Sequence, residues 1–130
     1  FINGKLSPFF QALHSHRHKL IYVGPGRLRV LGRWLKMAGW LETPLVNAWL
    51  EHERIVQEIL GCTSEGAVIG MSCGPAAKVI AHQVHTLRPD LTIIDFGSMF
   101  DGVCGFTSRS YHKGRDWSVI ARQMKATEAL

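Results

Sequence analysis

The sequence from Gly66 to Asp101, GAVIGMSCGPAAKVIAHQVHTLRPDLTIIDFGSMFD, predicts a strand, a turn, a helix and a second strand in that order. Residues 67–71 are nearly all apolar, which is typical of a strand buried on both faces of a parallel sheet. Pro75 suits the first turn of a helix, and apolar residues then recur at helical spacing as far as Leu87. Leu91–Asp95 supplies the second strand. The segment therefore predicts two parallel strands joined by a helical crossover.

Helical and strand-like periods also alternate over the rest of the chain. We expect helices over Pro8–His14, Arg27–Ala38 and Ala48–Leu60, and strands over Lys19–Gly24 and Thr43–Asn47. Residues 98–114 have no clear period, and residues 115–130 read as a polar, mildly helical tail. This order predicts one domain over residues 1–130 with an α/β fold, a three-layer Rossmann-like sandwich on a mostly parallel sheet.

The composition is that of a folded globular protein. Of the 130 residues, 46% are hydrophobic and 19% charged, and no apolar run approaches the roughly 20 residues of a membrane span. Cys62, Cys73 and Cys104 are widely spaced and form no CxxC pair, so we expect no disulfide framework and a cytoplasmic location. The net charge of +5 suits a phosphate-bearing small ligand. Nucleic acid is the weaker alternative, and a homo-oligomer is left open.

Small or polar residues follow both predicted strands of the opening segment. Open α/β sheets bind ligands outside the carboxyl ends of their strands. The turn Ser72–Ala76 precedes a helix, where free backbone N–H groups and the helix dipole favour a phosphate, so Ser72, Gly74, Pro75 and Ala76 are candidate phosphate-binding residues. The alternative is a tight strand-to-helix turn with no ligand. Cys73 reads as a small, half-buried residue more readily than as a nucleophile, since no base is defined beside it.

Acidic residues follow the second strand. Asp95 is the candidate catalytic base toward an acceptor hydroxyl, or it caps the amides of Gly97 and Ser98. Asp101 would share a divalent cation with Asp95, or it is a plain turn residue.

Further along, a donor-rich segment contains Arg109, Tyr111 and His112, which are suited to clamp a phosphate and stack on a base. Gly97 and Ser98 complete this group of candidate nucleotide-binding residues. The alternative for Arg109–His112 is a solvated loop without a ligand.

Several short motifs, in this order, resemble the C-terminal half of the GT-D glycosyltransferases, a family first described as a domain of unknown function. The matching motifs are VGPGRL from Val23, Asn47-Ala48-Trp49, SCGPAAKVIAHQV from Ser72, IDFGSMFD from Ile94, and TSRSYH from Thr107. The resemblance implies a glycosyltransferase-like protein with a nucleotide-sugar donor, an acceptor that the sequence does not identify, and a divalent cation, magnesium or manganese. It covers most of the chain, from about Lys19 to His112.

One family motif is absent from this sequence. The family's metal and diphosphate site uses an Asp-x-Glu motif, and the sequence contains none; Glu51-His52-Glu53 has similar spacing but lies within a predicted helix. Two interpretations follow: the chain is a fragment of a larger GT-D domain, or it is a reduced relative. The second makes it a non-catalytic Rossmann-like module that binds a nucleotide or mediates assembly.

Overall fold

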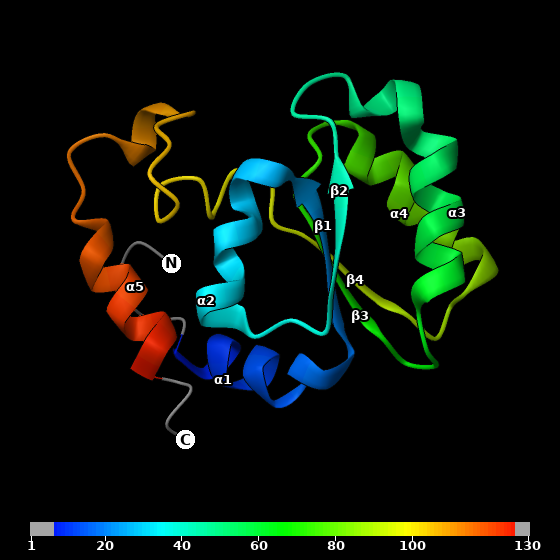
Figure 1. Cartoon of the computed structure of the whole chain (residues 1–130), viewed down its shortest axis with the longest axis horizontal. Coiled ribbons are helices and arrows are strands. Elements are labelled where there is room, and N and C mark those ends of the chain that lie inside the picture. Colours follow the sequence, from blue (N-terminus) through cyan, green and yellow to red (C-terminus); the bar gives the residue numbers. More distant parts are fainter. Residues whose placement is uncertain (1–6, 127–130) are drawn as a thin grey trace.

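A four-stranded, all-parallel sheet forms the middle layer of the described part of the chain, residues 7–126 of a computed structural model (Figure 1). The strands are β1 (Leu20–Pro25), β2 (Gly39–Thr43), β3 (Val68–Met71) and β4 (Thr92–Asp95), in the spatial order β2-β1-β3-β4. The predicted α/β sandwich is confirmed, and the strands predicted near residues 19–24, 67–71 and 91–95 are all present.

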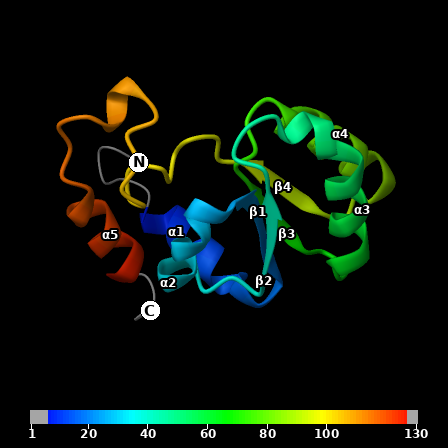
Figure 2. The same ribbon diagram turned by 45° about the horizontal axis from the view of Figure 1, so that its top comes forward.

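Helices cover both faces of the sheet (Figures 1 and 2). On one face lie α3 (His52–Cys62) and α4 (Ala76–Leu87). On the other lie α1 (Ser7–Ser15), α2 (Gly32–Leu35) and α5 (Trp117–Ala126). Short 3-10 helices are formed by Arg17–Lys19, Gly26–Leu31, Ala48–Glu51 and Ser110–His112. No helix in the described residues is long and apolar enough to cross a lipid bilayer.

Two hydrophobic cores share the sheet because successive strand residues point to opposite faces. In β1, Val23 joins the core under α3 and α4, whereas Tyr22 joins the core under α1, α2 and α5. The Tyr22 ring stacks between Trp40 and Phe96, with ring centroids 5.6 and 6.0 Å away. Gly70 lies beside this stack, and a Cβ atom there would come within 3.0 Å of the Tyr22 and Phe96 rings.

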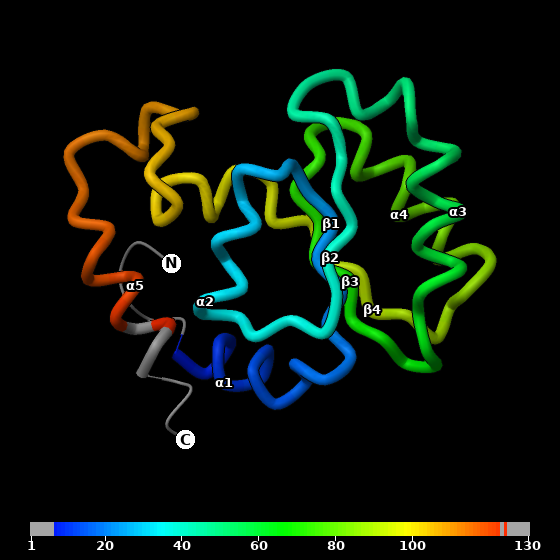
Figure 3. Tube along the Cα trace, viewed as in Figure 1, coloured from blue at the N-terminus to red at the C-terminus, as the bar shows by residue number. Residues whose placement is uncertain are grey.

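The strand order places a crevice at one edge of the sheet. From β1 the chain continues to β2 on one side, and β3, on the other side of β1, is followed by β4 (Figure 3). The loops after β1 and β3 therefore leave in opposite directions. This switch point is where doubly wound sheets bind their ligands.

The second strand differs from the sequence prediction. We expected Thr43–Asn47, but β2 spans Gly39–Thr43, and the apolar side chains of Leu45 and Val46 are 59% and 70% exposed. The helix expected over Arg27–Ala38 is instead a 3-10 helix followed by a single α-helical turn. It ends at Lys36, whose left-handed backbone (φ 48°) stops the helix and leaves room for the strand.

The tail is also better ordered than its polarity suggested. Residues Trp117–Ala126 form α5, and Ile120 and Met124 are buried in the core that contains Tyr22. Residues 115 and 116 of the predicted tail precede this helix, and residues 127–130 lie outside the described residues.

Candidate ligand-binding site

A cavity of about 550 Å³ opens at the carboxyl edge of the sheet, at the switch point between β1 and β3. Its volume lies within the usual range of small-molecule sites. Four loops contribute to it, one after each strand. Arg27 follows β1 and Leu45–Trp49 follow β2. Ser72–Ala76 follow β3, and the loop after β4 contributes Gly97, Ser98, Asp101, Ser108 and Arg109.

Most of the site residues predicted from sequence lie together around this cavity. Ser72, Gly74, Pro75, Ala76, Gly97, Ser98, Asp101 and Arg109 all line it. Asp95, Tyr111 and His112 do not. The cavity therefore unites the two predicted loops at the ends of β3 and β4, although the chain separates them by a helix and a strand.

The turn after β3 is held rigidly in place. The Ser72 side chain is buried, and its hydroxyl lies 2.6 Å from the Tyr22 hydroxyl. Burial raises the pKa of Tyr22, so its phenol stays protonated at neutral pH. Gly74 has a left-handed backbone (φ 63°), and its carbonyl accepts the Ala77 N–H. Because Pro75 has no N–H and the Ala77 N–H bonds to Gly74, the donors that this turn can offer to the cavity are the backbone N–H groups of Gly74 and Ala76.

Cys73 is unsuited to nucleophilic chemistry. The residue is buried, and its burial, with a smaller contribution from the charge of Asp95, raises the pKa of the thiol to about 12. A thiol with that pKa is protonated at neutral pH, whereas the thiolate is the reactive species. This agrees with the interpretation of Cys73 as a small packing residue.

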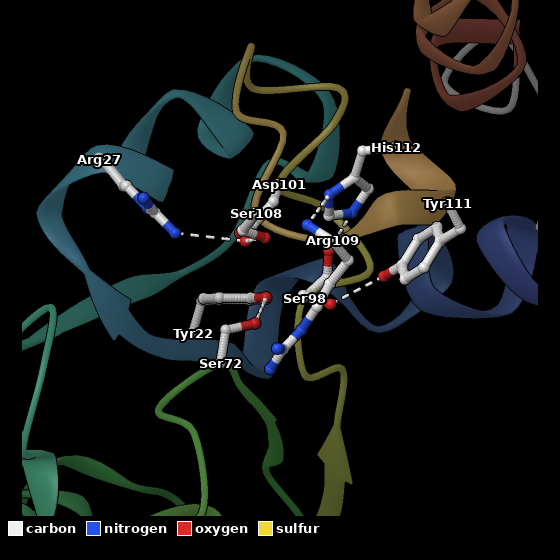
Figure 4. A network of polar contacts seen from close by, with 9 residues as sticks. All are labelled: Tyr22, Arg27, Ser72, Ser98, Asp101, Ser108, Arg109, Tyr111 and His112. Carbon is white, nitrogen blue, oxygen red and sulfur yellow. Dashed lines mark hydrogen bonds and ion pairs between the residues drawn. The ribbon is translucent and has the colours of Figure 1, made fainter. Parts of the chain in front are cut away.

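The Asp101 carboxylate is buried and accepts hydrogen bonds from two other side chains (Figure 4). Its Oδ2 accepts hydrogen bonds from Arg27 Nη2 at 3.2 Å and from the Ser108 hydroxyl. The Arg27 guanidinium also lies 4.6 Å from the ring centroid of Phe106. The ion pair with Asp101 and the contact with the Phe106 ring hold Arg27 at the wall of the cavity.

The described acidic side chains near the cavity do not form a site for a divalent cation. Within residues 7–126 no group of three His, Cys, Asp or Glu side chains is placed to hold a metal ion. Asp101, whose oxygen already faces Arg27, does not fit a shared cation with Asp95.

We call residues 98–112 the strap. Hydrogen bonds of Tyr111 and His112 with Ser98 connect its two ends (Figure 4). His112 is 1% exposed, and its Nδ1 accepts the backbone N–H of Arg109 at 3.0 Å. This leaves the hydrogen on Nε2, which donates to the Ser98 carbonyl at 3.0 Å. The Tyr111 hydroxyl lies 2.7 Å from the Ser98 hydroxyl.

His112 therefore holds the backbone of Arg109, Tyr111 holds the side chain of Ser98, and neither of the two lines the cavity. Figure 4 shows the Arg109 side chain running from the strap toward the Ser72–Tyr22 pair. Arg109 is exposed and makes no ion pair within the described residues. Its guanidinium is thus available to an anionic ligand.

Asp95 occupies the turn after β4. Its side chain is exposed, and Oδ1 accepts the Gly97 N–H at 2.9 Å, as the capping alternative predicted. It is not among the cavity-lining residues. Its catalytic role stays a prediction.

Three residues that line the cavity, Arg27, Asn47 and Trp49, were not among the site residues expected from the sequence. Arg27 follows the turn Gly24-Pro25-Gly26 and was counted in a helix, although its position directly after a strand was a usable signal. Asn47 ends the expected strand Thr43–Asn47, and Trp49 lies in the expected helix Ala48–Leu60, where it was interpreted as a core or interface residue and not as a ligand platform. Searches of protein-family models, curated proteins and solved structures found no match to this chain.

Proposed function

We propose that this protein binds the diphosphate of a nucleotide-sugar donor in the cavity at the carboxyl edge, as a glycosyltransferase-like protein. The observation that favours this most is the meeting of three anion-binding elements around one cavity. These are the first turn of α4, the guanidinium of Arg27 and the guanidinium of Arg109. Helix N-termini and guanidinium groups are the donors that proteins most often direct at phosphate.

Sugar transfer is the more demanding part of the proposal. It rests on the motif resemblance and on Asp95 as the base. The alternative function is a non-catalytic nucleotide-binding or assembly module. Two observations favour the alternative: the sequence lacks Asp-x-Glu, and Asp101, the carboxylate at the cavity wall, is neutralised by Arg27.

Binding is tested by titrating uridine, adenosine and guanosine diphosphates, with and without magnesium, by calorimetry and by backbone amide NMR. The amides of Gly74 and Ala76 are expected to shift. Arg109→Ala is expected to weaken binding about 10-fold or more, since a charge-assisted hydrogen bond contributes roughly 1.5–3 kcal/mol. The matched control is Arg33→Ala, which removes the same charge from an exposed site outside the cavity.

Two results would contradict the binding proposal. One is an Arg109→Ala protein that binds these nucleotides as tightly as the unmodified protein. The other is saturation without any change at Gly74 and Ala76, which would place the ligand elsewhere. Tighter binding with magnesium than with a chelator would contradict the finding that Asp95 and Asp101 do not fit a shared cation, whereas equal affinity would agree with it.

Catalysis is tested by donor turnover with magnesium or manganese. If the protein is active, Asp95→Asn is expected to lower the transfer rate roughly 100-fold or more, the scale of a general base. Asp95 also accepts the Gly97 N–H, which an amide oxygen can still do, so folding should be retained. Full activity in Asp95→Asn would exclude Asp95 as the base. Absence of turnover together with nucleotide binding would favour the non-catalytic module.

A further inference from the structure

The cavity has a second, apolar wall formed by the loop between β2 and α3. Leu45, Val46 and Trp49 line it, and they remain 59%, 70% and 51% exposed. Figures 1 and 2 both place this loop and the strap on different sides of the carboxyl edge. The cavity therefore joins a cationic wall to an apolar one, which suits a ligand with an anionic part and a flat apolar part.

Trp49 is held as a rigid surface. One face of the indole stacks on the His52 imidazole, with centroids 4.3 Å apart and planes 11° from parallel. His52 Nδ1 lies 2.7 Å from the Trp49 carbonyl and donates to it, which fixes the imidazole against the ring. An exposed tryptophan that is immobilised in this way loses little conformational entropy when a ligand stacks on it.

Asn47 adds a polar group beside this surface. Its backbone is left-handed (φ 57°), a conformation that asparagine adopts more readily than most residues other than glycine. Its side chain is exposed, lines the cavity and makes no hydrogen bond in the described part of the chain. A carboxamide offers both donors and an acceptor, as the edge of a nucleobase does.

We infer that Trp49 is the stacking platform for the nucleobase of the bound nucleotide and that Asn47 contacts the edge of that base. The inference rests on the proposed function, since it assigns the second half of the same cavity. The diphosphate lies against Arg27, Arg109 and the first turn of α4. Stacking on an aromatic side chain tolerates every base and discriminates only weakly among them, so Asn47 is the residue expected to select among bases.

The test compares a nucleotide with its phosphate part alone. Uridine diphosphate and inorganic pyrophosphate are titrated into the unmodified protein, Trp49→Ala and Trp49→Phe. Trp49→Ala is expected to weaken uridine diphosphate about 10-fold or more and to leave pyrophosphate affinity unchanged. Trp49→Phe keeps a ring and is expected to retain most of the affinity. The matched control is Leu50→Ala, since Leu50 is 81% exposed and does not line the cavity.

Asn47 is tested with Asn47→Gly, which keeps the left-handed backbone at no cost and removes the carboxamide. The ratio of affinities for uridine, adenosine and guanosine diphosphates is expected to move toward one. An unchanged ratio would overturn the role of Asn47.

Three results would overturn the role of Trp49. If Trp49→Ala bound uridine diphosphate as tightly as the unmodified protein does, Trp49 would not be the stacking platform, and the proposed function would still stand. Failure of both uridine diphosphate and pyrophosphate to bind the unmodified protein would reject the proposed function and the inference with it. A dimer in sedimentation that both Trp49→Ala and Leu50→Ala dissociate would make the apolar wall an interface between copies of the chain.

Discussion

Gly102 is packed against the indole ring of Trp117, where the strap passes α5. A Cβ atom at position 102 would overlap the ring atoms of that indole. Gly102→Ala is therefore expected to lower the free energy of unfolding by about 1–3 kcal/mol, the usual cost of overpacking. The measurement is urea denaturation at neutral pH.

Gly61→Ala is the matched control for this substitution. Gly61 lies within α3, and a Cβ atom there would meet no atom within 4 Å. Because alanine is the better helix former, Gly61→Ala is expected to stabilise the protein by about 0.5–1 kcal/mol. Equal stability of the two variants would show that the strap does not press on Trp117.

At the scale of elements, Asp90 ties the entry of β3 to the turn between α4 and β4. Its carboxylate accepts the Gly66 N–H at 2.9 Å and hydrogen bonds from the Arg88 guanidinium, also at 2.9 Å. These contacts, the Arg88 hydrogen bond above all, hold the pKa of Asp90 well below its usual range. A carboxyl whose pKa is lowered by folding stabilises the protein above its ordinary pKa of about 4. That contribution is lost as the pH falls.

Asp90→Asn is therefore expected to have a lower melting temperature than the unmodified protein at pH 7. The difference between the two should shrink below about pH 4, as Asp90 becomes protonated in the unfolded chain and then in the folded protein. Thermal melts from pH 2 to pH 7 measure it. If the difference in melting temperature did not change with pH, the lower stability of Asp90→Asn would come from the amide side chain and not from the lost charge.

How far each element could be predicted from sequence depended on how local its determinants are. Residues 67–95 were predicted well because apolar period, Pro75 and the polar strand ends all act within a few residues. Strand β2 was misplaced because Leu45 and Val46 are apolar yet exposed, and periodicity cannot distinguish a buried strand from an apolar cavity wall. Helix α5 was undervalued since two buried residues, Ile120 and Met124, are enough to dock it.

The site followed the same rule. The ends of β3 and β4 were expected to meet because neighbouring parallel strands end at one edge, and Ser72 and Ser98 do line one cavity. Arg27 directly follows the first strand, so the same rule could have placed it at this edge. Trp49 could not be placed there, because that requires the position of β2 in the strand order β2-β1-β3-β4, which no local pattern specifies. The pairing of Arg27 with Asp101 spans 74 residues and is equally invisible in the sequence.

At the scale of the whole molecule, the two hydrophobic cores lie on opposite faces of a single sheet. Val23 and Tyr22 are adjacent in β1, yet each belongs to a different core. Loss of either core would expose one face of every strand, so neither core should persist without the other. The prediction of one domain over residues 1–130 then requires that the protein unfold in a single cooperative transition.

Two substitutions test this cooperativity, one in each core. Ile55 in α3 is fully buried, and Ile120 in α5 is 6% exposed. Ile55→Ala and Ile120→Ala are each expected to cost about 2–5 kcal/mol. Tryptophan fluorescence reports mainly on the core under α1, α2 and α5, because Trp34, Trp40 and Trp117 pack against it. Far-ultraviolet circular dichroism reports on all helices. Urea transitions followed by the two signals should coincide in the unmodified protein and in both variants. If Ile120→Ala shifted the fluorescence transition alone, α5 and its core would unfold separately, and the single-domain prediction would be wrong.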